Sequence, residues 1–167
     1  MFPSTATIIG GPYTVTWNSL ALGIMEGDQG VPTVVTRSMA RMVESSDQYG
    51  AVQLGGFYLG ARGRAMMRCL EYDAATIGAS WPWGVDGALG VVGRDLYELS
   101  KTLLLTRASD TNSFTPGLTP ATLEAQKAIL APDHDVTLMF GPMVRTVPLE
   151  FILFPYGSAP GTLYTKS

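Results

Sequence analysis

The chain has 167 residues, of which 46% are hydrophobic and only 15% are charged, with a formal net charge of −3. This length fits one domain, 1–167, that buries a core without disulfides or metal, and the net negative charge disfavours tight nucleic-acid binding. The single cysteine excludes an intrachain disulfide. The lack of a secretory start or a ~20-residue apolar run predicts a protein of a reducing cytoplasm or of a particle assembled there.

The first third of the chain predicts a long β-hairpin. Residues 13–25 mix β-branched and aromatic side chains with glycines typical of turns or bulges, and residues 31–43 continue the strand pattern. The predicted tip between these arms consists of Glu26, Gly27, Asp28, Gln29 and Gly30. The second arm then ends at a corner formed by Asp47, Gln48, Tyr49 and Gly50.

A second strand pair follows the corner. Residues 52–58 and 62–72 are predicted strands, joined by a turn at 59–61. In the second of them, alternation places Arg62, Arg64, Met66, Arg68 and Leu70 on one face and Ala61, Gly63, Ala65, Met67 and Cys69 on the other. An arginine-bearing face opposite a small apolar face is typical of a half-buried strand, and it predicts a buried Cys69.

The middle of the chain contains the one predicted helix. Asp73 is a helix N-cap candidate, and two alanines follow it, so residues 73–80 are expected to form a short helix that ends near Trp81. The glycines at 84, 87, 90 and 93 predict a loop, and residues 97–107 return to strand. The polar segment 109–120 is predicted to be an exposed connection.

The last third adds further strands. Residues 122–130 are ambiguous, because Leu-Glu-Ala-Gln-Lys-Ala favours helix by propensity while alternate positions match a strand. We predict strand, because the neighbouring turn at 133–135 suits a hairpin into 136–140. Residues 136–140 and 147–154 form a predicted pair around the turn Gly141-Pro142. The expected fold is all-β, a β-sandwich or barrel with a long hairpin and one short flanking α-helix.

Catalytic and metal-binding patterns are weak throughout. His134 stands between two aspartates, but neighbouring residues of a strand point to alternate faces, so a solvated turn is the preferred interpretation over a metal or catalytic site. Residues 84–90 lack the Lys-Ser/Thr pair of a phosphate loop, and 78–82 depart from a nucleophile elbow at the last position. We therefore predict no catalytic residue, no metal ligand and no cofactor, and a protein that is not an enzyme.

Three sequence features occur in an order known from one family. They are Gly11-Pro12, the corner at 47–50 and the segment Arg145-Thr146-Val147-Pro148-Leu149-Glu150-Phe151. In this order the chain resembles the tail tube proteins of long-tailed bacteriophages. The resemblance implies hexameric rings that stack into a tube, a place in the virion tail, and DNA that passes through the lumen. It also implies the tape measure protein and the neck, terminator and distal tail proteins as partners.

The resemblance suggests roles for three groups of residues. Candidate lumen residues are Thr14, Thr16, Asn18, Thr36 and Ser38, and the predicted tip at 26–30 is a candidate contact between rings. Candidate subunit-interface residues are Asp47, Gln48, Tyr49, Trp81 and Trp83, because tryptophans in a Pro/Gly loop are costly to expose without a partner.

Two alternatives stay open. The first is a terminator, neck or distal tail ring protein of the same fold, which would form one ring instead of a stack. The second comes from another class, a ligand-binding β-sandwich with Trp81 and Trp83 as a stacking platform. With fewer basic than acidic residues, the chain is also expected to let DNA pass without binding it.

Overall fold

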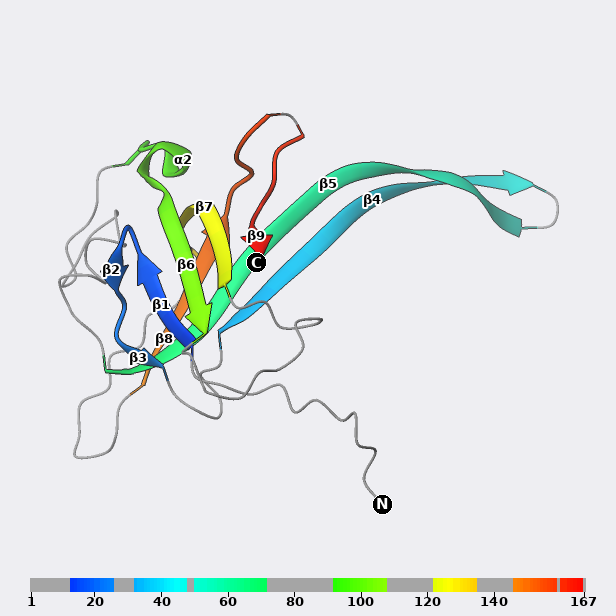
Figure 1. Ribbon diagram of the computed structural model, residues 1–167. Coiled ribbons are helices and arrows are strands. Elements are labelled where there is room, and N and C mark those ends of the chain that lie inside the picture. The colour runs from blue at the N-terminus through cyan, green and yellow to red at the C-terminus, as the bar shows by residue number, and fades with distance from the viewer. Residues whose placement is uncertain are drawn as a thin grey trace, which may run out of the picture.

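The computed structural model describes residues 13–25, 32–47, 50–71, 92–107, 122–134, 146–158 and 160–166. Within these residues the fold is all-β, as predicted: nine strands form one antiparallel sheet, accompanied by a four-residue helix (Figure 1). The elements are β1 (Tyr13–Trp17), β2 (Leu20–Ala21), β3 (Ile24–Met25), β4 (Thr33–Asp47), β5 (Gly50–Glu71), α2 (Leu96–Leu99), β6 (Lys101–Arg107), β7 (Thr122–Leu130), β8 (Val147–Leu153) and β9 (Thr165–Lys166).

The sheet curls into a barrel. Its hydrogen-bonded order is β2-β1-β6-β7-β8-β5-β3, with β4 added on β5 and β9 on β7. The two ends of this path, β2 and β3, are joined by Leu22 and Gly23 alone, so the sheet must bend until its ends meet. Leu22 is fully buried, and its backbone N–H donates to Val15 O at 3.0 Å. Gly23 has a φ of 118°, which glycine adopts without a Cβ clash.

One hydrophobic core fills the barrel. Strand β8 alternates strictly between buried and half-buried residues, with Leu149 and Phe151 pointing inward. From the opposite wall, Trp17 is buried and donates its indole N–H to Ala128 O at 2.8 Å, which ties β1 to β7 across the interior. The strand predictions for 122–130 and 147–154 are confirmed by β7 and β8. In 122–130, pairing with β6 and β8 and burial of the last three residues outweigh helix propensity.

The longest strands, β4 and β5, form the hairpin of this fold. They pair antiparallel from Thr33 opposite Met66 out to Asp47 opposite Gly50. The predicted pairing of 13–25 with 31–43 is therefore wrong, and residues 47–50 are the hairpin end instead of a corner. The cause is local: Asn18 and Ser19 both have positive φ, which turns β1 tightly onto β2 and splits the predicted first arm into three short strands.

The turn predicted at 59–61 is also wrong. Strand β5 runs without interruption for 22 residues, and the register shifts where Met39 pairs with Gly60 and Ala40 pairs with Tyr58. Leu59 is the extra residue of a β-bulge, and Gly60 takes the positive φ of 109° that such a bulge uses. The face assignment along 61–69 is confirmed, because Gly63, Ala65, Met67 and Cys69 are buried while the arginines between them are exposed.

The described helix lies outside the predicted one. Of the strand predicted over 97–107, the part Lys101–Arg107 is confirmed by β6, whereas residues 97–99 belong to α2. The Asp95 side chain caps this helix by accepting from the Tyr97 backbone N–H at 2.8 Å. Tyr97 also stacks edge-on against Phe154, with ring centroids 5.8 Å apart, and this contact holds α2 against the barrel. The predicted helix at 73–80, the loop at 109–120 and the strand at 136–140 lie outside the described residues.

Candidate assembly surface on the β4–β5 arm

The hairpin projects far beyond the barrel (Figure 1). Strand β8 pairs with β5 only from Gly63 to Cys69, so β5 before Gly63 has β4 as its one described neighbour. We call residues 37–47 and 50–62 the arm. On its other edge β4 pairs with no other strand in the part of the chain that the structure describes. The arm is thus a two-stranded ribbon with two open edges.

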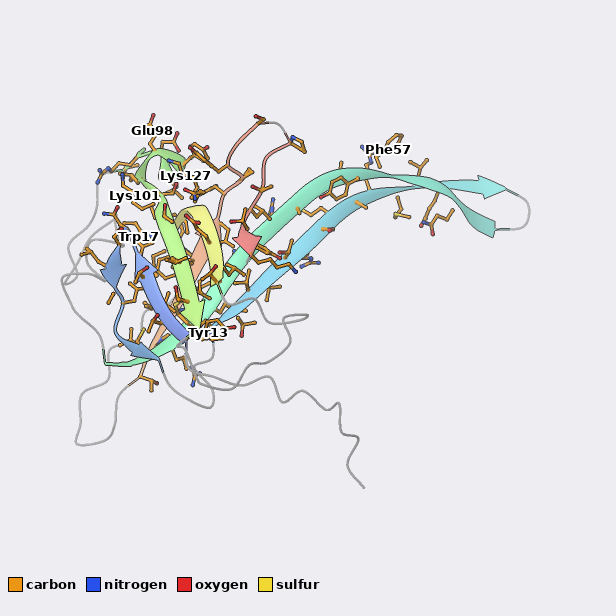
Figure 2. The ribbon with its side chains drawn as sticks, viewed as in Figure 1. Tyr13, Trp17, Phe57, Glu98, Lys101 and Lys127 are labelled. Carbon is orange, nitrogen blue, oxygen red and sulfur yellow. The ribbon has the colours of Figure 1, made fainter. Side chains whose placement is uncertain are left out.

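Large apolar side chains are exposed on this arm. They are Met42, Val43, Phe57, Tyr58 and Leu59, and Phe57 and Tyr58 are 66% and 70% exposed. Figure 2 shows Phe57 far out on the ribbon, away from the side chains that fill the barrel. Large exposed apolar groups on a protruding element are typical of an interaction surface.

The register defines two faces of the ribbon. Residues that pair directly share a face, so Thr36, Ser38 and Gly63 lie on the side that continues the barrel interior. We call this the body face. A Cβ on Gly63 would lie 3.2 Å from Leu153 and 3.3 Å from Leu163, and the Thr36 hydroxyl donates to the Tyr164 hydroxyl at 3.3 Å. The C-terminal segment therefore covers the body face where the arm leaves the barrel.

The opposite face, which we call the outer face, carries arginines. On it Val35 pairs with Arg64, Arg37 with Arg62, and Arg41 with Phe57. All of these side chains are exposed. The outer face thus combines positive charge with one large aromatic ring.

An ion-pair cluster braces the base of the arm. Arg64 donates to Glu150 of β8 and, at 2.9 Å, to Asp133 of the turn after β7. These carboxylates raise the pKa of the Arg64 guanidinium, and Arg64 in turn lowers the pKa of Asp133. Because β5, β8 and the β7 turn meet at Arg64, this side chain fixes the direction in which the arm leaves the barrel.

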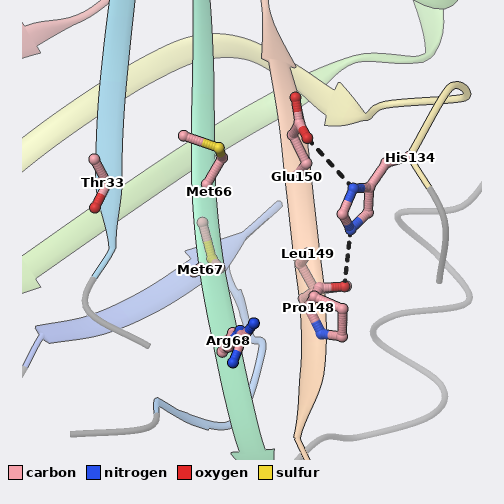
Figure 3. Close-up of a pocket in the computed structure, with 8 residues that line it drawn as sticks. All are labelled: Thr33, Met66, Met67, Arg68, His134, Pro148, Leu149 and Glu150. Carbon is pink, nitrogen blue, oxygen red and sulfur yellow. Dashed lines mark hydrogen bonds and ion pairs between the residues drawn. The ribbon is translucent and has the colours of Figure 1, made fainter. Parts of the chain in front are cut away.

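His134 belongs to the same cluster, which corrects the solvated-turn interpretation. Its Nδ1 lies 3.3 Å from a Glu150 carboxylate oxygen, and its Nε2 lies 3.2 Å from Pro148 O (Figure 3). Its side chain is only 20% exposed. The turn over 132–134 directs the imidazole onto β8 instead of into solvent, and the backbone N–H of His134 donates to Ala131 O at 3.2 Å.

A pocket of about 260 Å³ lies beside this cluster, along β5 and β8 (Figure 3). Met66, Met67 and Leu149 supply apolar walls, while Arg68, His134 and Glu150 supply charge or hydrogen-bonding groups at its rim. Glu150 and His134 already face each other. Within the described residues no group of three or more His, Cys, Asp or Glu side chains could hold a metal ion.

The predicted lumen residues lie on two separate surfaces. Thr14 and Thr16 alternate with the buried Val15 and Trp17, so they point outward from the barrel wall. Asn18 belongs to the β1–β2 turn, and its backbone N–H donates to Thr102 O at 2.9 Å. Thr36 and Ser38 lie together on the body face of the ribbon. The structure therefore brings only the last two close to each other.

Most of the other predicted contact residues lie outside the described part of the chain. This applies to the tip residues Glu26 to Gly30, to Gln48 and Tyr49, and to Trp81 and Trp83. Asp47 is described through its backbone alone, as the last residue of β4 opposite Gly50. Their assigned roles stay predictions.

The apolar and basic residues of the arm were not among the predicted sites. The signal for Phe57, Tyr58 and Leu59 was present as three consecutive large apolar residues between glycines, in a segment with no alternating polar face. The signal for Arg37 and Arg41 was their spacing of four residues, which puts both on one face of a strand. Strand alternation had grouped only Arg62, Arg64 and Arg68.

Two further observations concern the described residues. Cys69 is buried in the barrel, and this burial raises the pKa of its thiol to about 11, so the thiolate is scarce near neutral pH. No helix in the described ranges has the length and apolarity to cross a membrane.

Comparisons with known proteins give limited information. Neither a protein-family model nor a curated protein matches the sequence. Among solved structures, the chain is similar to the tube-terminating cap of the anti-feeding prophage, determined by cryo-electron microscopy. The identity is 10% and the TM-score is 0.41, over 91% of this chain and 87% of that chain. These comparisons assign the chain to no family.

Proposed function

We propose that this protein is a structural component of a phage-type tail whose copies assemble into rings, hexameric in the form that the sequence resemblance implies. The arm is the element that joins the copies. The observation that carries the proposal is a long β-ribbon that leaves the barrel with both edges open and with Phe57, Tyr58 and Leu59 exposed.

The arm has few contacts that would stabilise it in an isolated copy. A two-stranded hairpin in water is marginally stable, because it needs a third strand or a packed face to offset the entropy of ordering its chain. At roughly 3.3 Å per residue, the 22 residues of β5 span about 70 Å, whereas β8, with 7 residues, spans about 23 Å. Most of this extra length lies where no described strand of the barrel supports it.

Neighbouring copies supply the missing support. When the free β4 edge of one arm pairs with the free β5 edge of the next, each open N–H and C=O of the ribbon gains a partner. This contact joins two different edges, so it is heterologous, and repetition by rotation closes a ring. Stacked rings form a tail tube, while a single ring fits a terminator, a neck or a distal tail protein.

The proposed role is structural and not catalytic. The one ionisable cluster described at the arm, Arg64 with Asp133, Glu150 and His134, is paired internally and suits bracing of the arm. The tape measure protein and the other tail proteins are proposed partners in the virion.

Electron microscopy and light scattering of the purified protein at micromolar concentration test the proposal. We expect rings or tubes from the wild type, and monomers from a triple variant in which Phe57, Tyr58 and Leu59 are replaced by Ser. A control triple variant replaces exposed apolar residues away from the arm, Leu20, Val92 and Tyr156, by Ser and should still assemble. A wild type that stays monomeric at every salt concentration would overturn the proposal.

A further inference from the structure

The outer face collects a large share of the positive charge of an acidic protein. The β4–β5 ribbon carries Arg37, Arg41, Arg62, Arg64 and Arg68, out of only 11 lysines and arginines in the chain. All five lie on exposed positions, and the register places Arg37 directly opposite Arg62. Although the net charge is −3, these five arginines form a basic row along one face of the ribbon.

The side chains of Arg37, Arg41 and Arg62 in this row are not neutralised by any described residue. Like charges directly opposite each other on a sheet are destabilising, so the Arg37–Arg62 pair costs the free monomer stability. Arg64 forms ion pairs with the carboxylates of Glu150 and Asp133. Arg37, Arg41 and Arg62 have no hydrogen bond or ion pair to any described residue. The row is thus arranged for an anion that the chain itself does not provide there.

The described side chains on the arm of a second copy offer no such anion beside the arginines either. Glu44 is the only acidic residue among the described side chains of the arm, and it follows the second register shift, away from the arginines. Arms that pair edge to edge therefore place arginines beside arginines. Assembly concentrates the positive charge, which favours an external polyanion as the occupant.

The chemistry of the row suits phosphates. Guanidinium groups offer planar forks of donors that match phosphate oxygens, and two of them facing each other can hold one phosphate between them. Arg37 and Arg41 lie four residues apart on one face of β4, about 13 Å along the strand, so an extended polyanion can contact both.

We propose that the outer face of the arm binds the phosphate backbone of a nucleic acid through Arg37, Arg41 and Arg62. The position of this face in the assembly rests on the ring of the proposed function. In that ring, the outer face points away from the barrel bodies and toward the space that the arms enclose. Contacts of this kind carry no base specificity and weaken steeply with salt, so a strand can slide past them. Net charge alone predicted passage without contact, and the distribution of the charge predicts weak, mobile contact.

The test is fluorescence anisotropy with a labelled duplex between about 50 and about 200 mM salt. The variant Arg37→Gln/Arg62→Gln is compared with Lys101→Gln/Lys166→Gln, which removes the same charge from exposed positions off the arm. Each lost phosphate contact reduces the salt slope by about 0.9, so over this range the wild-type affinity should fall about tenfold more than that of the arginine variant. The lysine variant should behave as the wild type does.

Equal binding by the two double variants would overturn the inference, as would a wild type that does not bind the duplex at the lower salt. Displacement of the duplex by poly-glutamate at matched charge would also overturn it, in favour of an acidic protein partner. Electron microscopy of the same samples separates this inference from the ring proposal. Arginine-dependent binding by a monomer would sustain the inference alone, and rings with unchanged binding would sustain the ring alone.

Discussion

The two halves of strand β5 have opposite environments. From Gly63 to Met66 the strand lies between β4 and β8, and at Cys69 it lies between β3 and β8. In this half every second residue is buried, and Ala65 and Cys69 have no exposed surface. Across the arm from Gly55 to Leu59 every residue is exposed, although the hydrogen bonding to β4 continues. The backbone conformation is the same in both halves, so what differs is the presence of a third strand and a packed face.

This difference indicates which half folds by itself. Among the described residues, the barrel half closes a core that draws mainly on β1, β5, β6, β7 and β8. The arm half gains only ribbon hydrogen bonds, which contribute little net free energy in water. The arm is therefore expected to be the part of the described structure whose order depends on assembly, and the following substitutions separate the two regions.

The largest effect is expected in the barrel. Phe151 has no exposed surface, so Phe151→Ala removes a buried ring and leaves a cavity that lowers the free energy of unfolding by about 3–5 kcal/mol. Chemical denaturation measures this loss. Ile152→Ala, at the adjacent half-buried position, is the control and should cost less. A similar loss from both substitutions would contradict a core confined to one face of β8.

The next effect is expected at the bulge. Gly60 has a φ of 109°, so Gly60→Ala strains the backbone by about 1–3 kcal/mol. Because Gly60 lies beyond the residues that pair with β8, the strain should accelerate amide exchange in the arm and leave the barrel transition unchanged. Gly55→Ala, with open space around its Cβ position and no positive φ, is the matched control. A lower barrel stability in Gly60→Ala would show that the two regions fold as one unit.

A third substitution, in the arm, should affect assembly while it leaves the free energy of unfolding nearly unchanged. Phe57 is the arm counterpart of Phe151, and Phe57→Ala should change the free energy of unfolding by no more than about 0.5 kcal/mol. It should nevertheless raise the concentration needed for assembly at least about fivefold, since an aromatic anchor at an interface contributes more than about 1 kcal/mol. Light scattering against concentration measures this shift. Tyr156→Ala, exposed but off the arm, should leave the curve in place.

Sequence patterns predicted the barrel better than the arm. Alternation predicted the buried and exposed faces of 61–69, because a half-buried strand imposes a period of two on its side chains, and β8 alternates in the same way. In β7 the last three residues are all buried, so alternation did not decide that strand. In the arm no buried face imposes such a period. The turn-like Leu59-Gly60-Ala61 therefore predicts a turn, whereas the structure has a β-bulge there.

The hairpin was misplaced for a related reason. Pairing across 33–47 and 50–71 is decided by register over a long distance, which no local residue pattern encodes. The basic row was missed because Arg37 and Arg62 come together only through this pairing. The cluster at Arg64 was missed for the same reason, because Arg64, Asp133 and Glu150 belong to three different segments that meet only in the fold.

The smallest effect is expected at the brace between arm and barrel. Arg64 hydrogen-bonds Asp133 and so lowers the pKa of that carboxyl. A lowered pKa in the folded state means that the contribution of Asp133 to stability is complete above the ordinary value of about 3.9 and is lost as the pH falls through the lowered one. In Arg64→Gln the NMR titration of Asp133 should move upward toward the ordinary value. The stability difference from wild type should then shrink below about pH 4. Arg62→Gln, on the same face but without a contact to Asp133, should leave that titration unchanged. An upward shift in both variants would mean that the general charge of the outer face, and not the specific hydrogen bond at the base of the arm, sets the pKa of Asp133.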